Sequence, residues 1–388
     1  MTGSSATGGP GGAERFARTA LSFVAQPGDL TLGALLRARG PAGAFAAICA
    51  GGPADTVGAG SGIPGLSRAT QRWAARLDSV PPDSRFAAWE RAGIRVVCPG
   101  DPEWPTQLDV LGDARPLVLW LQGSADLRFT CLRSVSIVGA RAATGYGQHV
   151  ATEMAAGLAE RRWAVISGGA YGIDSSAHRG ALGADGVTVA VLASGISYGY
   201  PKGHHELFAA IAGQGVVVSE WPPDQAPTRP GFLVRNRVIA ALSRGTVVVE
   251  AAVRSGALST ARHARDLCRP LMAVPGPVTS ALSEGCHEII REWAAVCVTR
   301  AQDVIEHVSP CGDGLSARRR GPACPRDGLD PVTSAVLEAV PSRAGNGPAA
   351  IAISAGVDLD TAIRCLGALA AAGFVERCVR GWRVRKNA

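Results

Sequence analysis

Two short segments of the 388-residue sequence combine glycine with polar or charged side chains in a way that suits anion binding. The first reads GARAATGYG at 139–147, and the second reads SGGAYGID at 167–174. Each follows an apolar run and precedes a stretch with helical character. Small residues let backbone amides approach an anion at a helix N-terminus, and the forked guanidinium of Arg141 suits phosphate. Arg141, Gly168 and Gly169 are therefore candidate phosphate contacts.

A third segment adds an aromatic ring and more cations. It reads FLVRNR at 232–237 and is followed by VEAAVRSG at 249–256. An aromatic side chain beside forked cations suits a nucleobase stacked on Phe232, with its phosphates held by Arg235 and Arg237. The hydroxyl of Ser255 could supply a neutral donor to phosphate. The residues alone leave open a second interpretation, in which Arg235 and Arg237 are solvated surface charges.

Enzyme motifs are poorly supported. The glycine-rich segment at 139–147 is not G-x-G-x-x-G, and the sequence contains no Walker A motif, so ordinary NAD binding and ATP hydrolysis are not expected, and no cofactor is predicted. GISYG at 195–199 fits G-x-S-x-G, but the following residues prolong a loop where a hydrolase needs a strand-to-helix turn. Glu220 and Glu250 are the carboxylates with catalytic potential. Hydrogen-bonded structural roles at strand ends remain an alternative for both.

The elements that must position these segments alternate between apolar runs and helical stretches. Runs that are apolar on both faces and separated by helices predict an α/β fold, namely a Rossmann-like, doubly wound parallel sheet. Ligands of such sheets bind at the carboxyl ends of the strands, so the residues just after each apolar run are the strongest candidates. The predicted strands are 135–138, 164–166, 188–192, 216–218, 246–249 and 271–274.

The flanking sequence predicts two further domains. A helical domain is predicted at residues 13–100, with the helical pattern at 14–77 and a short strand at 94–97; a further strand at 116–121 leads into the main domain. GIPGL at 62–66 resembles the turn of a helix-hairpin-helix, although a simple turn between packed helices fits equally well. Residues 1–12 are predicted to form a disordered tail and residues 310–329 a linker. Residues 330–388 read as three helices and a hairpin, the order of a winged helix. Such modules bind duplex DNA or protein, and the sequence does not decide between the two.

The amino-acid composition indicates what kind of partner the protein binds and in which cellular compartment it is found. The net charge of +7 and the pI near 9.1 favour an anionic partner. The sequence contains neither an apolar run long enough to span a membrane nor a secretory leader, so a cytoplasmic protein that does not insert into membranes is expected. Ten scattered cysteines without C-x-x-C pairs predict reduced thiols and no metal site.

Taken together and in order, the motifs resemble those of the DNA-processing protein A family, DprA or Smf. The resemblance covers roughly residues 101–308, within the predicted Rossmann-like domain at 101–309. WPTQL at 104–108 and PLVLW at 116–120 resemble the family's lead-in. The segments that carry the resemblance are SIVGAR at 136–141, SGGAYGID at 167–174, RNR at 235–237, VEAAVRSG at 249–256 and AVPG at 273–276.

The resemblance implies a non-enzymatic protein that binds single-stranded DNA in a basic pocket, forms a homodimer and loads the RecA recombinase during recombination or natural transformation. Two positions depart from the family pattern: Leu233 replaces a proline and Ala140 replaces a serine. The alternative function is nucleotide cleavage by a phosphoribohydrolase of related fold, whose Pro-Gly-Gly-x-Gly-Thr loop is missing here. By match to the family, the DNA contacts are Arg141, Lys202, Phe232, Arg235, Asn236, Arg237 and Arg254.

Overall fold

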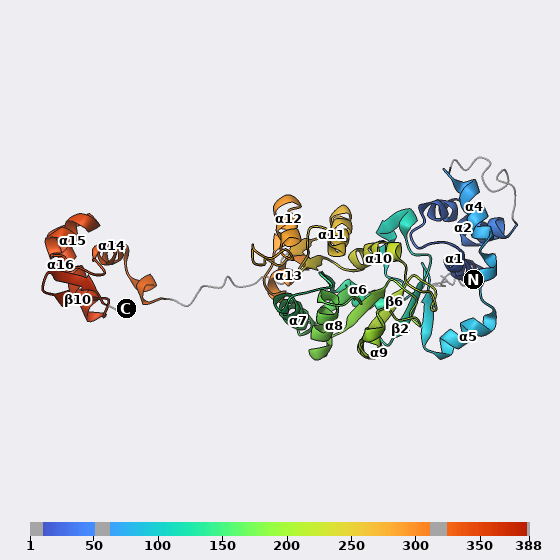
Figure 1. The fold of residues 1–388 in the computed structure, drawn as a ribbon, viewed down its shortest axis with the longest axis horizontal. Coiled ribbons are helices and arrows are strands. Elements are labelled where there is room, and N and C mark those ends of the chain that lie inside the picture. The colour runs from blue at the N-terminus through green and yellow to red at the C-terminus, as the bar shows by residue number, and fades with distance from the viewer. Residues whose placement is uncertain (1–10, 51–62, 311–323, 386–388) are drawn as a thin grey trace, which may run out of the picture. The chain divides into compact units, whose positions relative to one another are not determined.

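The computed structural model describes residues 11–50, 63–310 and 324–385 (Figure 1). Its residues fall into two compact units, Met1–Ser316 and Ala317–Ala388. The first unit contains a nine-stranded sheet with helices, and the second contains helices and a two-stranded hairpin. No helix within the described ranges is long and apolar enough to cross a membrane.

The sheet of the first unit is mostly parallel, as the sequence predicts. Its strand order is β1-β2-β6-β5-β4-β3-β7-β8-β9, and only the β1–β2 and β2–β6 pairs are antiparallel. The six strands predicted for this sheet correspond to β3 through β8. The strands are β1 (Ile94–Val97), β2 (Leu119–Gly123), β3 (Ser134–Val138), β4 (Ala164–Gly168), β5 (Thr188–Leu192), β6 (Val216–Ser219), β7 (Thr246–Val248), β8 (Leu271–Ala273) and β9 (Val296–Cys297).

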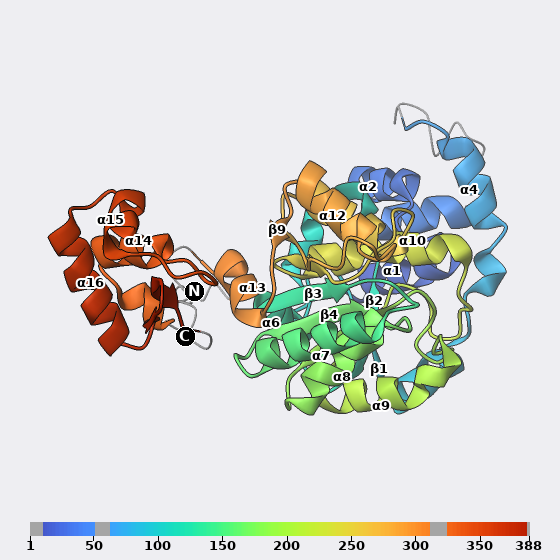
Figure 2. The same cartoon turned by 60° about the vertical axis from the view of Figure 1, so that its left-hand side comes forward.

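Helices cover both faces of this sheet, which explains why β3 to β8 are buried along their whole length (Figure 2). Helices α7, α8, α9 and α13 pack on one face, and α6, α10, α11 and α12 pack on the other. The helices are α6 (Leu127–Leu132), α7 (Gly145–Ala159), α8 (Ile173–Gly183), α9 (His205–Gln214), α10 (Arg229–Leu242), α11 (Gly256–Asp266), α12 (Glu284–Glu292) and α13 (Ala301–Val308). A short 3-10 helix, η3 (Lys202–His204), precedes α9.

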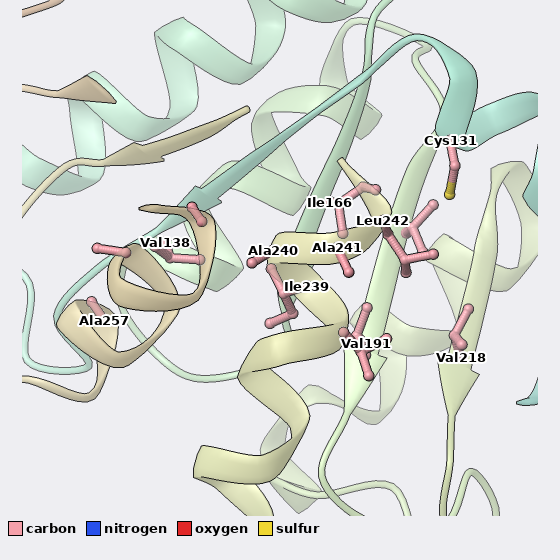
Figure 3. Packing of buried hydrophobic residues seen from close by; sticks show 14 of the residues in the cluster. Cys131, Val138, Ile166, Val191, Val218, Ile239, Ala240, Ala241, Leu242 and Ala257 are labelled. Atoms are coloured by element: carbon pink, nitrogen blue, oxygen red, sulfur yellow. The ribbon is translucent and has the colours of Figure 1, made fainter. Parts of the chain in front are cut away.

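Helix α10 is held firmly against the sheet by its C-terminal half. Residues 239–242 are buried, and they pack with Val138, Ile166, Val191 and Val218 of four different strands (Figure 3). This contact fixes the orientation of α10 about its own axis. The packing of residues 239–242 therefore determines in which direction each polar residue earlier in α10 faces.

The strand order creates an opening at one edge of the sheet. From β3 the chain proceeds through β4 and β5 to β6 on one side, and then crosses to β7 and β8 on the other side of β3. The loop after β3 leads to α7 on one face, whereas the loop after β7 leads to α11 on the opposite face. Because the two loops diverge, a crevice opens at the carboxyl ends of β3 and β7.

The N-terminal helices build a separate cluster of buried side chains that includes Leu21, Leu35, Ile48 and Trp73. Strand β1 precedes the predicted domain boundary at residue 100, yet it pairs with β2 in the main sheet. Of the predicted GIPGL turn, Gly62 lies outside the described residues, and Gly65 caps α4 with φ +71°. These elements are α1 (Gly12–Val24), α2 (Leu30–Cys49), α4 (Leu66–Ala74), η1 (Leu77–Ser79), α5 (Asp83–Arg91) and η2 (Thr106–Ala114).

The second unit has the three helices and the hairpin that the sequence predicts. Its core contains Val336, Ile351, Leu366, Leu369 and Phe374. Most of the predicted linker and tail, residues 311–323 and 1–10, lies outside the described residues, and α1 begins at Gly12. The elements are η4 (Pro325–Gly328), α14 (Pro331–Ala339), α15 (Pro348–Ala355), α16 (Leu359–Ala371), β10 (Val375–Cys378) and β11 (Gly381–Val384).

Candidate anion-binding site

A cavity of about 480 Å³ opens at the crevice, between the carboxyl ends of the strands and the helices α10 and α11. A smaller cavity adjoins it and shares Arg141, Phe232 and Arg235 with it. Of the contact residues predicted from the sequence, five line the larger cavity and Gly169 lines the smaller one. The five are Arg141, Phe232, Arg235, Asn236 and Ser255.

Arg235 is the buried cation of the cavity. The residue is 6% exposed, its Nη1 donates to the carbonyl of Val191, and its Nε donates to Asn236 Oδ1 at 3.3 Å. No carboxylate oxygen of the described chain lies within 4.0 Å of its guanidinium nitrogens. Burial lowers the pKa of Arg235 to about 10, because loss of solvent disfavours the charged form; Asp174 opposes this effect and Arg141 adds to it. A desolvated cation without an ion-pair partner is stabilised by a bound anion.

Gly168 and Gly169 of the second segment make room for neighbouring side chains, which are Arg235 and Phe208 respectively. A Cβ at Gly168 would lie 2.4 Å from Arg235 Nη1, so the guanidinium lies directly against the strand end. A Cβ at Gly169 would lie 2.8 Å from the ring of Phe208, and its φ is +20°. Both positions therefore require glycine for close packing. Gly169 also lines the smaller cavity. Gly168 does not line it, but it packs against Arg235, which does.

Aromatic side chains and a second arginine form the rim. The Cζ of Arg141 lies 4.6 Å from the ring centroid of Phe232, and the ring of Tyr200 lies 5.7 Å from the same centroid. Arg141 is exposed and Phe232 is half-buried. The guanidinium therefore covers one face of the Phe232 ring, in a cation–π contact of the kind that also accompanies base stacking.

Asn236 and Ser255 position the start of α11. Asn236 Nδ2 donates to the carbonyl of Gly256 at 3.2 Å, and Ser255 Oγ accepts from the backbone N–H of Ala257 at 3.2 Å. Ser255 is the N-cap of α11, and Gly256 and Ala257 line the cavity beside it. The positive end of the α11 dipole thus borders the same cavity as Arg235.

Arg237, which the sequence predicts as a DNA contact, lies outside the lining of both cavities. Its Nη1 and Nη2 donate to the two carboxylate oxygens of Glu220 at 2.5 and 2.7 Å, with side-chain exposures of only 7% and 4%. Its Nε donates to the carbonyl of Ala114 at 3.1 Å, and its guanidinium lies against Gly28. Arg237 therefore joins α10 to η2 and to the turn after α1.

Lys202 and Arg254 are exposed and lie outside the lining of both cavities. Lys202 opens η3, one residue after Pro201, which borders the smaller cavity. Arg254 lies directly before Ser255 on the loop after β7. Both cations are thus neighbours of lining residues in the chain, and the structure does not bring their side chains into the cavity.

One carboxylate shares the cavity with these cations. Asp174 is 6% exposed, and its Oδ2 accepts from the backbone N–H of Ala170 at 3.4 Å. Burial raises the pKa of Asp174, and the charge of Arg235 and hydrogen bonds from Ala170 and Ser167 partly oppose that shift. An ionised Asp174 would partly neutralise Arg235 and repel a bound anion, and so would weaken its binding.

The two carboxylates with catalytic potential are both engaged by the fold. Glu250 is 3% exposed, and it accepts from the backbone N–H of Thr144 at 2.9 Å and from its hydroxyl at 2.5 Å. This carboxylate therefore sits at the N-terminus of α7, where the helix dipole favours a negative charge. Glu220 is occupied by Arg237. These contacts are the structural roles that the sequence left as an alternative.

Among the lining residues that sequence reasoning missed are a cation, Arg229, and an aromatic residue, Tyr200. Helical spacing could have found Arg229, because it lies three residues before Phe232 and seven before Asn236, on one side of α10. The same rule separates Arg235 from Arg237, which are about 200° apart around a helix of 3.6 residues per turn. Tyr200 lies in a loop and carries no such periodic signal.

The fold and the cavity define an α/β protein with a cation-lined pocket at the carboxyl ends of its parallel strands, a geometry suited to phosphate-bearing ligands. The model of the family described as DNA recombination-mediator protein A matches residues 95–309. That range is more than half of the sequence, and the chain belongs to this family, also known as DprA or Smf.

Individual relatives agree with this assignment. A DprA of Mycobacterium tuberculosis is 43% identical over 375 residues, which cover 94% of this chain and 92% of the relative. The crystal structure of DNA processing protein A from Streptococcus pneumoniae has a TM-score of 0.61 at 30% identity, with 74% of this chain and 95% of that chain covered. A structure of the Helicobacter pylori protein, reported for its single-stranded DNA binding mode, has a TM-score of 0.50 at 29% identity and covers 55% and 94%.

Proposed function

We propose that this protein binds single-stranded DNA in the cavity beside α10 and that it makes or breaks no bond there. The observation that carries the proposal is Arg235, a buried guanidinium without a carboxylate partner among the described residues, set in a cavity that also contains Arg141 and Arg229. Such an arrangement favours an anionic ligand, since Arg235 has lost its hydration and has no ion-pair partner. The exposed Arg141 and Arg229 add positive charge that outweighs the carboxylate of the cavity, Asp174.

The aromatic side chains at the rim of the cavity favour a single-stranded ligand over a duplex. Phe232 and Tyr200 offer aromatic rings at the mouth of the cavity, and bases can stack on such rings only when they are unpaired. The phosphates would lie on Arg141, Arg229 and Arg235 and near the N-terminus of α11. Outside the cavity, the DNA strand would continue along Lys202 and Arg254. Arg237 would not touch the DNA and would support the site by holding α10 in place through its ion pair with Glu220. Single-strand binding is also what the Helicobacter pylori structure reports of that relative.

The engaged carboxylates support a role without catalysis. Cleavage of a nucleotide by a phosphoribohydrolase needs a free carboxylate, and the two that the sequence singles out, Glu220 and Glu250, are bound within the fold, which leaves Asp174 as the carboxylate of the cavity. Incubation of the protein with nucleoside monophosphates checks this alternative. We expect no release of free base, and release at an enzymatic rate would replace the binding proposal with the phosphoribohydrolase.

Recombination is the cellular setting that the family indicates. We infer that the protein acts as a cytoplasmic homodimer that holds single-stranded DNA and helps to load the RecA recombinase in recombination or natural transformation. The strand order and the helices on both faces support a Rossmann-like, doubly wound description of the main sheet. The second unit fits a winged helix, and the N-terminal helices fit a helix-hairpin-helix or SAM-like domain.

The experiment that tests the proposed function is a titration of the intact protein with a labelled oligonucleotide, once single-stranded and once as a duplex. We expect tighter binding of the single strand and a loss of that binding in Arg141→Gln/Arg235→Gln. A variant with Arg161→Gln serves as the matched control, because this exposed arginine lies outside both cavities. Equal single-strand affinity of the double variant and the wild type would refute the site.

A further inference from the structure

The hairpin β10–β11 of the second unit carries an unusual concentration of charge. Residues 375–385 contain four arginines and one glutamate, a net charge of +3, whereas residues 324–374 of the same unit have a net charge of −2. Arg383 pairs with Glu376 at 2.6 Å. No described carboxylate lies within 4.0 Å of Arg377, Arg380 or Arg385, and all three are exposed. The hairpin therefore presents three uncompensated cations.

The tip of the hairpin adds an apolar residue that folding does not explain. Val379 is fully exposed at the turn between the strands and precedes Arg380. The base of the hairpin is fixed, because Val375 is buried and Trp382 packs against the core of the unit. The backbone of Trp382 also exchanges hydrogen bonds of 3.0 and 2.8 Å with Asn346. The cations and the exposed valine thus project from an anchored ribbon.

Helix α16 has the opposite character. Its N-terminus carries Asp358 and Asp360, and its outward side exposes Leu359 and Ile363 with a single nearby cation, Arg364. In a helix-turn-helix the N-terminal residues of the second helix, which would be α16 here, approach the base edges and the flanking phosphates. Two carboxylates at that position would be repelled by the phosphates. The helix is therefore poorly suited to enter a groove of DNA.

We propose that the second unit is a separate nucleic-acid site that contacts the backbone of duplex DNA through the hairpin β10–β11 and its tip, and not through α16. A duplex suits this surface better than a single strand does. The described aromatic residues of the unit are Phe374, which is buried, and Trp382, which packs in the core with Arg377 5.9 Å from its ring centroid. Phe374 is therefore not available for the base stacking that single-strand sites use, and the half-buried Trp382 is only partly available.

The test compares variants of the full-length chain for binding to a labelled blunt duplex. Arg377→Gln/Arg380→Gln/Arg385→Gln removes the three uncompensated charges, and the corresponding triple lysine variant keeps them. Arg364→Gln is the matched control on α16. Equal unfolding midpoints in denaturant establish that the variants are folded, as expected for exposed side chains.

We expect the triple glutamine variant to bind duplex at least about tenfold more weakly, with a salt slope smaller by about 0.9 for each phosphate that the variant no longer neutralises. The triple lysine variant and Arg364→Gln should stay within about threefold of the wild type, since backbone contacts depend mainly on charge. Single-strand affinity should not change. The single-strand measurement keeps the two proposals apart. If the proposed single-strand site were wrong, substitution of Arg235 would leave single-strand affinity unchanged, whatever the hairpin variants do to duplex binding.

Three results would overturn the proposal. The first is duplex affinity that is unchanged in the triple glutamine variant. The second is a larger loss in Arg364→Gln than in the triple variant, which would assign the contact to α16. The third is wild-type protein that binds no duplex, which would make the unit a protein-binding module.

Discussion

Helix α10 carries a buried arginine on each of two sides, and the two arginines have different surroundings. Arg235 and Arg237 are two positions apart, and both are only 6% exposed. Arg237 makes a two-point ion pair with Glu220, whereas Arg235 faces a cavity and has no carboxylate within 4.0 Å in the described chain. Burial lowers the pKa of Arg235, but the guanidinium stays charged at neutral pH.

This comparison separates an arginine that the fold requires from one that a ligand requires. The charge of Arg237 is compensated within the molecule, so its removal leaves Glu220 buried and unpaired. Arg235 has no such ion pair and is compensated only in part, by the charge of Asp174 in the cavity, so its removal costs the fold less and costs an anionic ligand more. Proximity in a sequence motif is therefore weak evidence for a shared role when the motif lies on a helix.

The largest expected effect concerns stability. Arg237→Ala should lower the free energy of unfolding by about 3–5 kcal/mol, because a buried ion pair that loses one partner leaves the other charge uncompensated. Denaturant unfolding measures this change. Glu220→Gln/Arg237→Gln is the control and should lose less than the single variant, since no charge is stranded. An Arg237→Ala protein with wild-type stability would remove the distinction between the two arginines.

A smaller effect is expected for the ring at the rim. Phe232→Ala should weaken binding of a single-stranded oligonucleotide by about 1–3 kcal/mol, because stacking of one base contributes that much. Phe232→Tyr keeps a ring and should bind like the wild type. Both are measured by fluorescence anisotropy. Since Arg141 already covers one face of the ring, an unchanged affinity of the alanine variant would indicate that the base stacks elsewhere.

The smallest effect concerns the carboxylate in the cavity. Asp174→Asn should raise single-strand affinity a few-fold at neutral pH, because it removes a negative charge that competes for Arg235. The wild type should bind more tightly as the pH falls, and this trend should be weaker in the variant. Binding titrations at several pH values measure both, and weaker binding by Asp174→Asn would contradict the repulsive role.

The same carboxylate affects stability with a defined sign. Burial raises its pKa above 3.8, so the folded protein holds a proton that the unfolded chain has released. The contribution of Asp174 to the free energy of unfolding therefore falls as the pH rises from 3.8 through the raised pKa. Denaturant unfolding over that range should show a smaller decline in Asp174→Asn.

The sequence predicts much of this architecture because the deciding signals are local. Strands β3 to β8 are apolar on both faces, and that pattern marks a covered parallel sheet whose loops share one edge. Strand β9 has two exposed residues and gives no such signal. The Glu220–Arg237 pair joins residues from different elements, so no local pattern contains it. The orientation of Arg229 and Arg237 could have been predicted, had helical spacing been applied to 229–237.

The central claim is that Arg235 holds phosphate, and the salt dependence of single-strand binding tests it most directly. For the wild type and Arg235→Gln, the affinity for a labelled oligonucleotide is measured from low to high salt at constant pH. We predict that the variant loses about 1.5–3 kcal/mol of binding free energy, as expected for a charged hydrogen bond. Its slope of log affinity against log salt should be smaller by about 0.7, which is one single-strand phosphate. A folded variant with wild-type affinity and an unchanged slope would contradict the account.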